Sequence, residues 1–215
     1  MKTIRLFIFD LDGTLVNTLE DITHSVNFTL GRLGRPLLRL DTVRQYIGDG
    51  MKMLLTRALD GHEDLLEQAI GIYTVHQSRN LVVRSRLYPG VRETLKHFQS
   101  IPMAVVTNKA LEFSEPLLEK LGIRTFFAMV LGADAGLPLK PAPDAFLKIL
   151  RELDVTKEQA AVVGDGTTDI LAGRAAGITT CAAAYGFRSE AELRSAGPDQ
   201  VIHAFPELRK LFRAA

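Results

Sequence analysis

Short runs of apolar residues recur along the chain, and each run ends in small or polar residues. The runs are IRLFIF before Asp10, MAVVTN around Val105, FAMVLGAD before Asp134, AAVVGDG before Asp165 and TTCAAAYG around Ala183. They are apolar at nearly every position rather than at alternate ones, which is typical of strands that are covered on both faces. The pattern therefore predicts the strands of a buried parallel sheet.

Helical patterns separate these runs. Their apolar stripes are formed by Val91, Leu95 and Phe98, then by Phe113, Leu117 and Leu121 before Gly122, then by Phe146, Ile149, Leu150 and Leu153, and finally by Leu171, Ala172, Ala175 and Ala176 before Gly177. Glycine directly after such a stripe is a common helix end. The alternation of strand and helix predicts an α/β fold with a Rossmann-like, doubly wound parallel sheet as its core. In such folds functional groups gather at the carboxyl ends of the strands.

One long stretch interrupts this alternation. Residues 17–86 contain helical patterns, such as Ile22, Val26, Leu30 and Leu33, but no convincing strand. The LYPGV segment that follows supplies the Pro-Gly pair at which the chain would return to the core. We therefore expect an inserted α-helical cap domain at residues 17–86, and a catalytic core made of residues 1–16 and 87–215.

Composition and charge narrow the class of protein. The chain has 215 residues, 47% of them hydrophobic and 24% charged, which is an ordinary globular balance. Lysine and arginine number 26 against 25 acids, so there is no general field to attract nucleic acid or a membrane surface. No segment has the length and apolarity of a membrane span, and the first residues lack a signal-peptide pattern. We expect a cytoplasmic protein.

Thiol and imidazole chemistry is not indicated. The chain has one cysteine, Cys181, which lies among apolar residues and is interpreted as a small buried hydrophobic residue. The histidines show no spacing typical of metal ligands. Function must therefore come from other side chains.

Acids stand at the ends of two predicted strands. Asp10 and Asp12 follow the first strand, and Asp165 and Asp169 surround the end of a later one. Side chains alternate along an extended chain, so Asp10 and Asp12 are expected to point the same way. If the two strands are neighbours, the acids converge, and they cannot all stay ionised unless a cation joins them. Oxygen ligands without histidine or thiolate suit Mg²⁺.

The same edge should hold groups that bind a phosphoryl oxygen. Thr107 and Asn108 end the MAVVTN run, and Lys140 stands in LKPAPDAF. A hydroxyl, backbone amides and an ammonium group are suitable donors for phosphoryl oxygens. Together with the acids and Mg²⁺, they predict phosphoryl transfer.

Four motifs carry a family resemblance. DLDGTL, VVTNK, KPAPDAF and GDGTTDILAGRAAG resemble, in order and spacing, the motifs of the haloacid dehalogenase superfamily of Mg²⁺-dependent phosphatases, over nearly the whole chain. Within it, YIGDG, YPGV, VTNK and AAAYGF are similar to the phosphoglycolate phosphatase family. The chain departs from many relatives at Gly166, where they carry serine, and at Asn17, where they carry aspartate.

The resemblance implies a mechanism. Asp10 would attack phosphorus and form an aspartyl-phosphate, while Asp12 would protonate the leaving group and then deprotonate water. Mg²⁺ would be held by the carboxylates of Asp10 and Asp165 and by the backbone carbonyl of Asp12, with Asp169 coordinating directly or through water. Lys140 would offset negative charge, and Thr107, Asn108 and amides near Leu11 would bind the phosphoryl oxygens. An acid at position 12 favours a phosphoester over a halide leaving group, which needs no proton.

The substrate is the open part of the prediction. In IGDGMK, the loop residues Gly48 and Gly50 and the following Lys52 could bind the carboxylate of 2-phosphoglycolate, or form an ordinary loop with a solvated lysine. We interpret Arg57, Arg79 and Arg84 as solvated cap residues. The alternatives are a phosphatase for a sugar phosphate, an amino-sugar phosphate or pyrophosphate, a β-phosphoglucomutase-like mutase, or a non-catalytic binding module. We expect a small phosphorylated metabolite as the partner, and a monomer or homodimer.

Overall fold

A central parallel sheet organises the molecule. The computed structural model describes all 215 residues. Six strands lie in the order β6-β5-β2-β7-β8-β9, and every neighbouring pair is parallel. Their bounds are β2 Leu6–Phe9, β5 Met103–Val106, β6 Met129–Leu131, β7 Ala160–Gly164, β8 Thr179–Ala183 and β9 Gln200–Ile202. The predicted α/β fold with a buried parallel sheet is confirmed, and β9 is an addition to the predicted strands.

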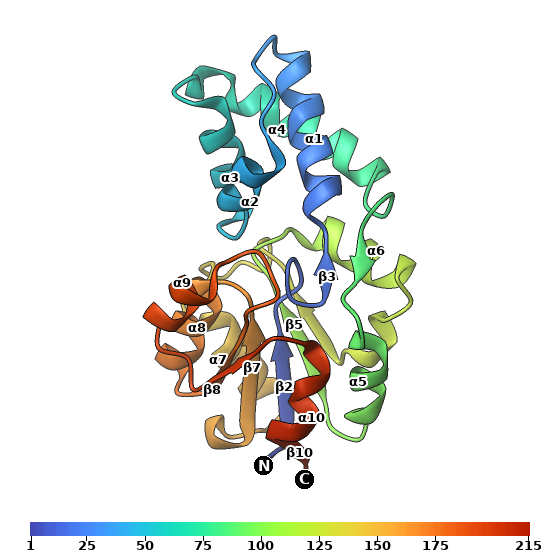
Figure 1. Cartoon of the computed structure of the whole chain (residues 1–215), viewed down its shortest axis with the longest axis vertical. Coiled ribbons are helices and arrows are strands. Elements are labelled where there is room, and N and C mark those ends of the chain that lie inside the picture. The colour runs from blue at the N-terminus through green and yellow to red at the C-terminus, as the bar shows by residue number, and fades with distance from the viewer.

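Helices cover both faces of this sheet (Figure 1). On β2, Phe7 and Phe9 belong to one apolar cluster, whereas Leu6 and Ile8 belong to another on the opposite face. The first cluster includes residues of α5 (Val91–His97), α6 (Leu111–Lys120) and α10 (Leu208–Leu211). The second includes residues of α7 (Asp144–Glu152) and α8 (Thr167–Ala176). Both faces of β2, β5 and β7 are therefore buried, which explains the continuous apolar sequence of these strands.

The predicted stripe of α8 is wrong at two positions. Leu171 is 46% exposed and Ala175 is also exposed, whereas Ile170, Ala172, Gly173 and Ala176 are buried. A Cβ on Gly173 would come within 2.5 Å of Val162 in β7, so this helix approaches the sheet too closely for a side chain there. Small residues of α8 face the sheet. The predicted stripe was wrong because it included Leu171, which lies on the solvent side.

A group of helices lies beyond the carboxyl ends of the strands (Figure 1). It consists of α1 (Leu19–Arg32), α2 (Leu40–Tyr46), α3 (Gly50–Leu59) and α4 (Leu66–Arg79). We refer to residues 19–79 as the helical unit. It has its own apolar cluster, with Val26, Leu55 and Tyr73 among the buried members.

The chain enters and leaves the helical unit side by side. β3 (Val16–Asn17) pairs antiparallel with β4 (Arg86–Leu87), so a two-stranded ribbon joins the two parts. The buried Asp21 carboxylate accepts hydrogen bonds from the backbone N–H and the hydroxyl of Ser85, at 2.8 and 2.7 Å. These bonds tie the start of α1 to the returning strand.

Short elements complete the fold. β1 (Lys2–Ile4) pairs in parallel with β10 (Phe212–Ala214), and the two ends of the chain lie together in Figure 1. α9 (Glu190–Ser195) follows β8, and the 3₁₀ turns are η1 Glu63–Leu65, η2 Arg124–Phe126, η3 Lys157–Gln159 and η4 Phe205–Glu207. None of the helices has both the length and the apolarity needed to span a bilayer.

Candidate active site

Three carboxylates converge at the carboxyl edge of the sheet. Asp10 directly follows β2 and Asp165 directly follows β7, and these two strands are paired neighbours. Asp169 lies in the first turn of α8, one turn further along. Each residue places a carboxylate oxygen within 4.8 Å of the others. The convergence expected for these three acids is therefore present.

Asp165 is held from two directions. Its Oδ1 accepts a hydrogen bond from the Thr14 hydroxyl at 2.9 Å, and its Oδ2 accepts one from the backbone N–H of Phe187 at 2.7 Å. Gly13 has a φ of +88°, and a Cβ there would lie 2.1 Å from Asp165 Oδ2. The glycine of DLDGTL is thus required both by the turn and by the approach of this carboxylate.

Lys140 lies among these acids. Its Nζ donates to Asp10 at 2.7 Å, to Asp169 at 2.6 Å and to the carbonyl of Val106 at 2.8 Å, and the residue is only 6% exposed. Burial lowers the pKa of Lys140, but attraction to Asp10 and Asp169 outweighs that effect and the pKa is raised. The lysine therefore stays an ammonium ion, as a charge-balancing role requires.

One ammonium leaves the cluster with excess negative charge. Burial raises the pKa of Asp10 to about 7, and Lys140 opposes that rise only in part. Burial and the charge of Asp10 also raise the pKa of Asp165. A divalent cation would favour the ionised forms of both groups, and three carboxylates without histidine or cysteine form a hard oxygen donor set. The cluster therefore fits a metal such as Mg²⁺.

Asp12 has different surroundings. Its carboxylate accepts from Lys109 Nζ at 3.0 Å and from the Thr18 hydroxyl at 2.7 Å, and it lies outside the three-acid cluster. The sequence pattern placed both acids of DLDGTL on one side, but the turn at Gly13 ends the extended alternation. The second acid instead faces a lysine 97 positions away in the chain.

Lys109 is a site residue that the sequence reasoning missed. Its side chain is only 9% exposed, and that of its partner Asp12 is 12% exposed. The residue ends the VVTNK motif, so the motif itself contained the only available indication. Its ammonium is paired with Asp12 and so fixes the position of that carboxylate.

Thr107 and Asn108 lie at the same edge but differ in their contacts. The Thr107 hydroxyl accepts from the backbone N–H of Lys109 at 3.2 Å, which leaves its own proton free to donate. Asn108 donates from Nδ2 to the carbonyls of Gly48 and Lys140, at 2.9 and 3.0 Å, and its Oδ1 accepts from the Lys140 N–H at 3.0 Å. The Asn108 side chain therefore connects the core to the helical unit.

A cavity lies next to Asp10 and Asp12, between the sheet edge and the helical unit. It is lined by Asp10, Asp12, Ile22, Ile47, Gly48, Gly50, Met51, Leu54, Tyr73, Thr107, Asn108, Lys109, Ala110 and Phe113. Gly48 and Gly50 thus lie at the cavity, as the sequence indicated. Lys52 does not line it, because this side chain is exposed on the outside of α3.

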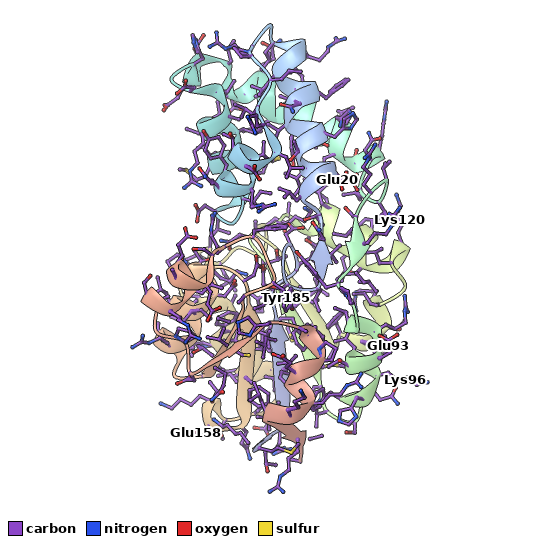
Figure 2. The ribbon with its side chains drawn as sticks, viewed as in Figure 1. Glu20, Glu93, Lys96, Lys120, Glu158 and Tyr185 are labelled. Carbon is purple, nitrogen blue, oxygen red and sulfur yellow. The ribbon has the colours of Figure 1, made fainter.

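The cysteine and the three arginines considered in the sequence lie outside the acid cluster. Cys181 is buried, as predicted, and burial raises the pKa of its thiol to about 12. Arg79 is exposed, and Arg84 pairs with Glu20 at the surface, where Figure 2 labels Glu20 at the base of α1. Arg57 is less free than predicted, because it pairs with Asp49 at 2.6 Å and donates to the Tyr46 carbonyl.

The two departures from the resembled motifs retain the local hydrogen bonds. The Gly166 N–H donates to Asp169 Oδ2 at 2.9 Å, which caps the start of α8 without a side-chain hydroxyl. Asn17 accepts a hydrogen bond from the N–H of Leu19 at the first turn of α1, through Oδ1 at 3.4 Å. Neither position removes a group from the acid cluster.

The fold and this cluster define a haloacid dehalogenase-like hydrolase. The model of that family matches residues 7–183, and the chain belongs to the family. It is 37% identical over 98% of its length to a phosphoglycolate phosphatase of Pseudomonas savastanoi pv. phaseolicola, covering 79% of that protein. It is 35% identical over its whole length to a phosphoglycolate phosphatase of Nitrosococcus oceani, covering 99% of that protein.

A solved structure agrees with this assignment. A predicted phosphoglycolate phosphatase from Haemophilus somnus superposes with a TM-score of 0.93 at 32% identity, covering 98% of this chain and 99% of the other. The chain is therefore an enzyme, a phosphatase of the haloacid dehalogenase family that acts on a small phosphorylated substrate.

Proposed function

We propose that the protein is a Mg²⁺-dependent phosphomonoesterase that acts through an aspartyl-phosphate on Asp10, with 2-phosphoglycolate as its substrate. The observation that carries the proposal is the cluster of Asp10, Asp165 and Asp169 around Lys140, next to a cavity that also contains Asp12. In the proposed mechanism Asp10 is the nucleophile and Asp12 the proton donor, and both line this cavity.

The carboxylates of Asp10 and Asp165 would hold Mg²⁺ together with the backbone carbonyl of Asp12, and Asp169 would hold it directly or through water. The bound metal supplies positive charge that offsets repulsion between the Asp10 carboxylate and an anionic phosphate. Lys140 orients Asp10 through their hydrogen bond and adds a second positive charge.

The reaction divides into two displacements. An oxygen of Asp10 attacks phosphorus while the ester P–O bond breaks, and Asp12 donates its proton to the departing alkoxide. Asp12 then takes a proton from water, whose oxygen attacks the same phosphorus, so the Asp10–phosphorus bond breaks and inorganic phosphate leaves. Lys109 and Thr18 fix the Asp12 carboxylate at the cavity for both steps.

The phosphoryl oxygens need donors at the sheet edge. We assign this role to the free hydroxyl proton of Thr107, to backbone amides near Leu11 and Asn108, and to the Lys140 ammonium. The two Nδ2 protons of Asn108 are already engaged by carbonyls, so its side chain holds Lys140 and Gly48 in place.

The helical unit would act as a cap, within an inserted domain at residues 17–86 on a core of residues 1–16 and 87–215. Its Gly48 and Gly50 face the acids across the cavity, and closing it would exclude water from the reacting phosphate. The part of the cavity wall that contacts the leaving group would then determine which substrates are accepted.

We assign the carboxylate of the substrate to the part of the wall around the start of α3. The first turn of α3 has no side-chain cap, so its N–H groups are available at the cavity next to Gly50. Tyr73 is only 3% exposed and lines the same cavity, where its hydroxyl would donate a further hydrogen bond. These donors suit the carboxylate of 2-phosphoglycolate, which agrees with the names of the relatives.

One observation favours a second candidate. The cavity wall includes Ile22, Ile47, Met51, Leu54 and Phe113, which gives it more apolar surface than glycolate requires. A bulkier ester, such as a sugar phosphate, would use that surface better.

Phosphate release distinguishes these functions. Purified protein should be assayed with 2-phosphoglycolate, sugar phosphates and pyrophosphate, with Mg²⁺ and with excess chelator, beside the Asp10→Asn variant. We expect Mg²⁺-dependent release with a preference for 2-phosphoglycolate and none from the variant. Retained turnover by Asp10→Asn would contradict the mechanism, whereas preference for a sugar phosphate would keep the mechanism and replace the substrate.

A further inference from the structure

Arg188 reaches from the core to the helical unit. It lies in the loop after β8, and its guanidinium donates to backbone carbonyls at the end of α2, with Nη1 3.1 Å from Gln45 and Nη2 2.6 Å from Ile47. A third carbonyl, that of Arg44, lies 3.4 Å from Nη1. These carbonyls have no partner within the helix, so a charged donor from the core satisfies them.

The same loop also holds a metal-site carboxylate. The Phe187 N–H donates to Asp165 Oδ2 at 2.7 Å, and a Cβ on Gly186 would lie 2.3 Å from the Asp165 Cβ. Tyr185 donates its hydroxyl proton to the Thr14 carbonyl at 2.9 Å, and Figure 2 labels this side chain near the centre of the molecule. The loop is therefore fixed to the acid cluster along several residues.

The Phe187 side chain strengthens the connection. It packs against the apolar cluster of the helical unit, although its backbone bonds to Asp165 in the core. Residues 44–47, which Arg188 contacts, immediately precede Gly48 and Gly50 at the cavity wall. A short path of contacts thus leads from Asp165 through the 185–188 loop to the segment that lines the substrate cavity.

We infer that Arg188 is a positioning residue that holds segment 44–50 over the acid cluster, and thereby closes the cavity around a small substrate. The inference rests on phosphatase action at the Asp10 site and on none of the particular substrates considered above. Small substrates, which make few contacts of their own, depend most on this closed position. A large, reactive aryl phosphate depends on it less.

Arginine has the shape that this contact needs. Its planar group carries several donors in a fixed arrangement and can meet carbonyls of successive residues together, whereas a lysine ammonium is a compact point charge. Asn108 provides the only other side-chain bond from the core to this segment, at the Gly48 carbonyl. Arg188 is therefore the main charged link between the two parts at this edge.

The test compares two substrates in three variants. For wild type, Arg188→Lys and Arg188→Ala, kcat and KM are measured with 2-phosphoglycolate, or with the small alkyl phosphate that the panel selects, and with p-nitrophenyl phosphate. We expect Arg188→Ala to raise KM for the small substrate roughly tenfold, the equivalent of about one charge-assisted hydrogen bond, with a change of less than about twofold for the aryl substrate. The KM of Arg188→Lys for the small substrate should lie between the values of wild type and Arg188→Ala.

A matched control is Arg92→Ala. Arg92 also donates to two backbone carbonyls at a helix end, those of Leu121 and Gly122, but entirely within the core. It should leave the ratio of the two substrates unchanged. Equal losses for both substrates in Arg188→Ala, as expected if Arg188 bound the phosphate directly, would overturn the inference.

Hydrogen exchange gives a readout that does not require turnover. With Mg²⁺ present, backbone amides of residues 44–50 should exchange faster in Arg188→Lys and Arg188→Ala, whereas amides of α4 should not. Unchanged exchange in segment 44–50 would contradict the proposed contact even if every assay substrate proved wrong. Faster exchange with no detectable turnover in wild type would instead retain the contact and reject the proposed function.

Discussion

Lys140 connects Asp10 to Asp169. Its ammonium donates to one oxygen of each carboxylate, at 2.7 and 2.6 Å, and both Lys140 and Asp169 are buried. One side chain from the loop before α7 therefore sets the position and the charge of Asp10, the proposed nucleophile.

Replacing Lys140 with methionine should lower phosphate release by about 10²–10³-fold, because a preorganised positive charge is lost where negative charge develops. The change also leaves the buried Asp169 carboxylate without its cation, which should destabilise the fold by about 3–5 kcal/mol. Steady-state kinetics and chemical denaturation measure the two effects. Lys148→Met removes an exposed pair with Glu152 and serves as the control. Near-normal turnover in Lys140→Met would contradict the assigned role.

Asp12→Asn should affect substrates according to their leaving groups. An alkyl phosphate needs a proton on its departing oxygen, so its turnover should fall by about 10²–10⁴-fold. p-Nitrophenyl phosphate has a stable leaving group, so formation of the aspartyl-phosphate should be slowed much less. A rapid-mixing assay of nitrophenol release detects this difference as an initial burst. Equal losses at the first step for both substrates would show that Asp12 is not the proton donor.

Mg²⁺ should stabilise the protein against heat. At a concentration about 100 times the Kd, binding adds about 2.7 kcal/mol, which for a chain of this size corresponds to a rise in Tm of roughly 5–10 °C. Differential scanning fluorimetry with Mg²⁺ and with chelator measures the shift. Asp165→Asn should lose most of it, because one of the three converging carboxylates becomes neutral. A full shift in that variant would place the metal elsewhere.

His76 should make the stability of the helical unit depend on pH. Burial lowers its pKa below the ordinary 6.5, and the neighbouring His24 adds to that effect. Its ring stacks on Phe28 with centroids 4.1 Å apart, and Nδ1 lies 3.0 Å from the Ser25 hydroxyl. Folding thus favours the neutral ring, so this contribution is present above about pH 6.5 and is lost as pH falls through the folded-state pKa.

The comparison is with His76→Gln, which does not titrate. Between about pH 7.5 and pH 5.5, the Tm of wild type should fall further than that of the variant. Titrating groups that do not interact with His76 act in both proteins and cancel in the difference. Parallel curves would show that His76 gains no proton-linked stability from its position.

The sequence predicted the sheet because its strands are buried on both faces. Runs such as AAVVG in β7 are apolar throughout, and acids at their ends were correctly placed at one edge. β9 and β10 were missed because each is short and contains polar or charged residues, as in Gln200 and Arg213. The central strands of the Rossmann-like core could therefore be predicted from the sequence, whereas the short strands β9 and β10 could not.

Contacts between distant segments were harder to predict. The pair of Lys109 and Asp12 joins residues 97 positions apart, and Arg188 reaches carbonyls about 140 positions earlier, at Arg44 to Ile47. A single lysine or arginine in a loop carries no periodic pattern that would reveal its partner. Lys52 shows that closeness in sequence is no better guide, since it stands two residues after Gly50 but is exposed and does not line the cavity.

The pairing of β1 with β10 bears on how the protein can be rebuilt. Ala215 donates its backbone N–H to the carbonyl of Ile4 at 2.9 Å, so the first and last strands lie side by side, away from the helical unit (Figure 1). A short linker could join them into a circular chain, with new ends opened at the exposed turn around Gly61. The ends of such a permuted enzyme, where another protein can be fused, would lie in the helical unit instead of beside β1 and β10. The residues of the acid cluster would be unchanged.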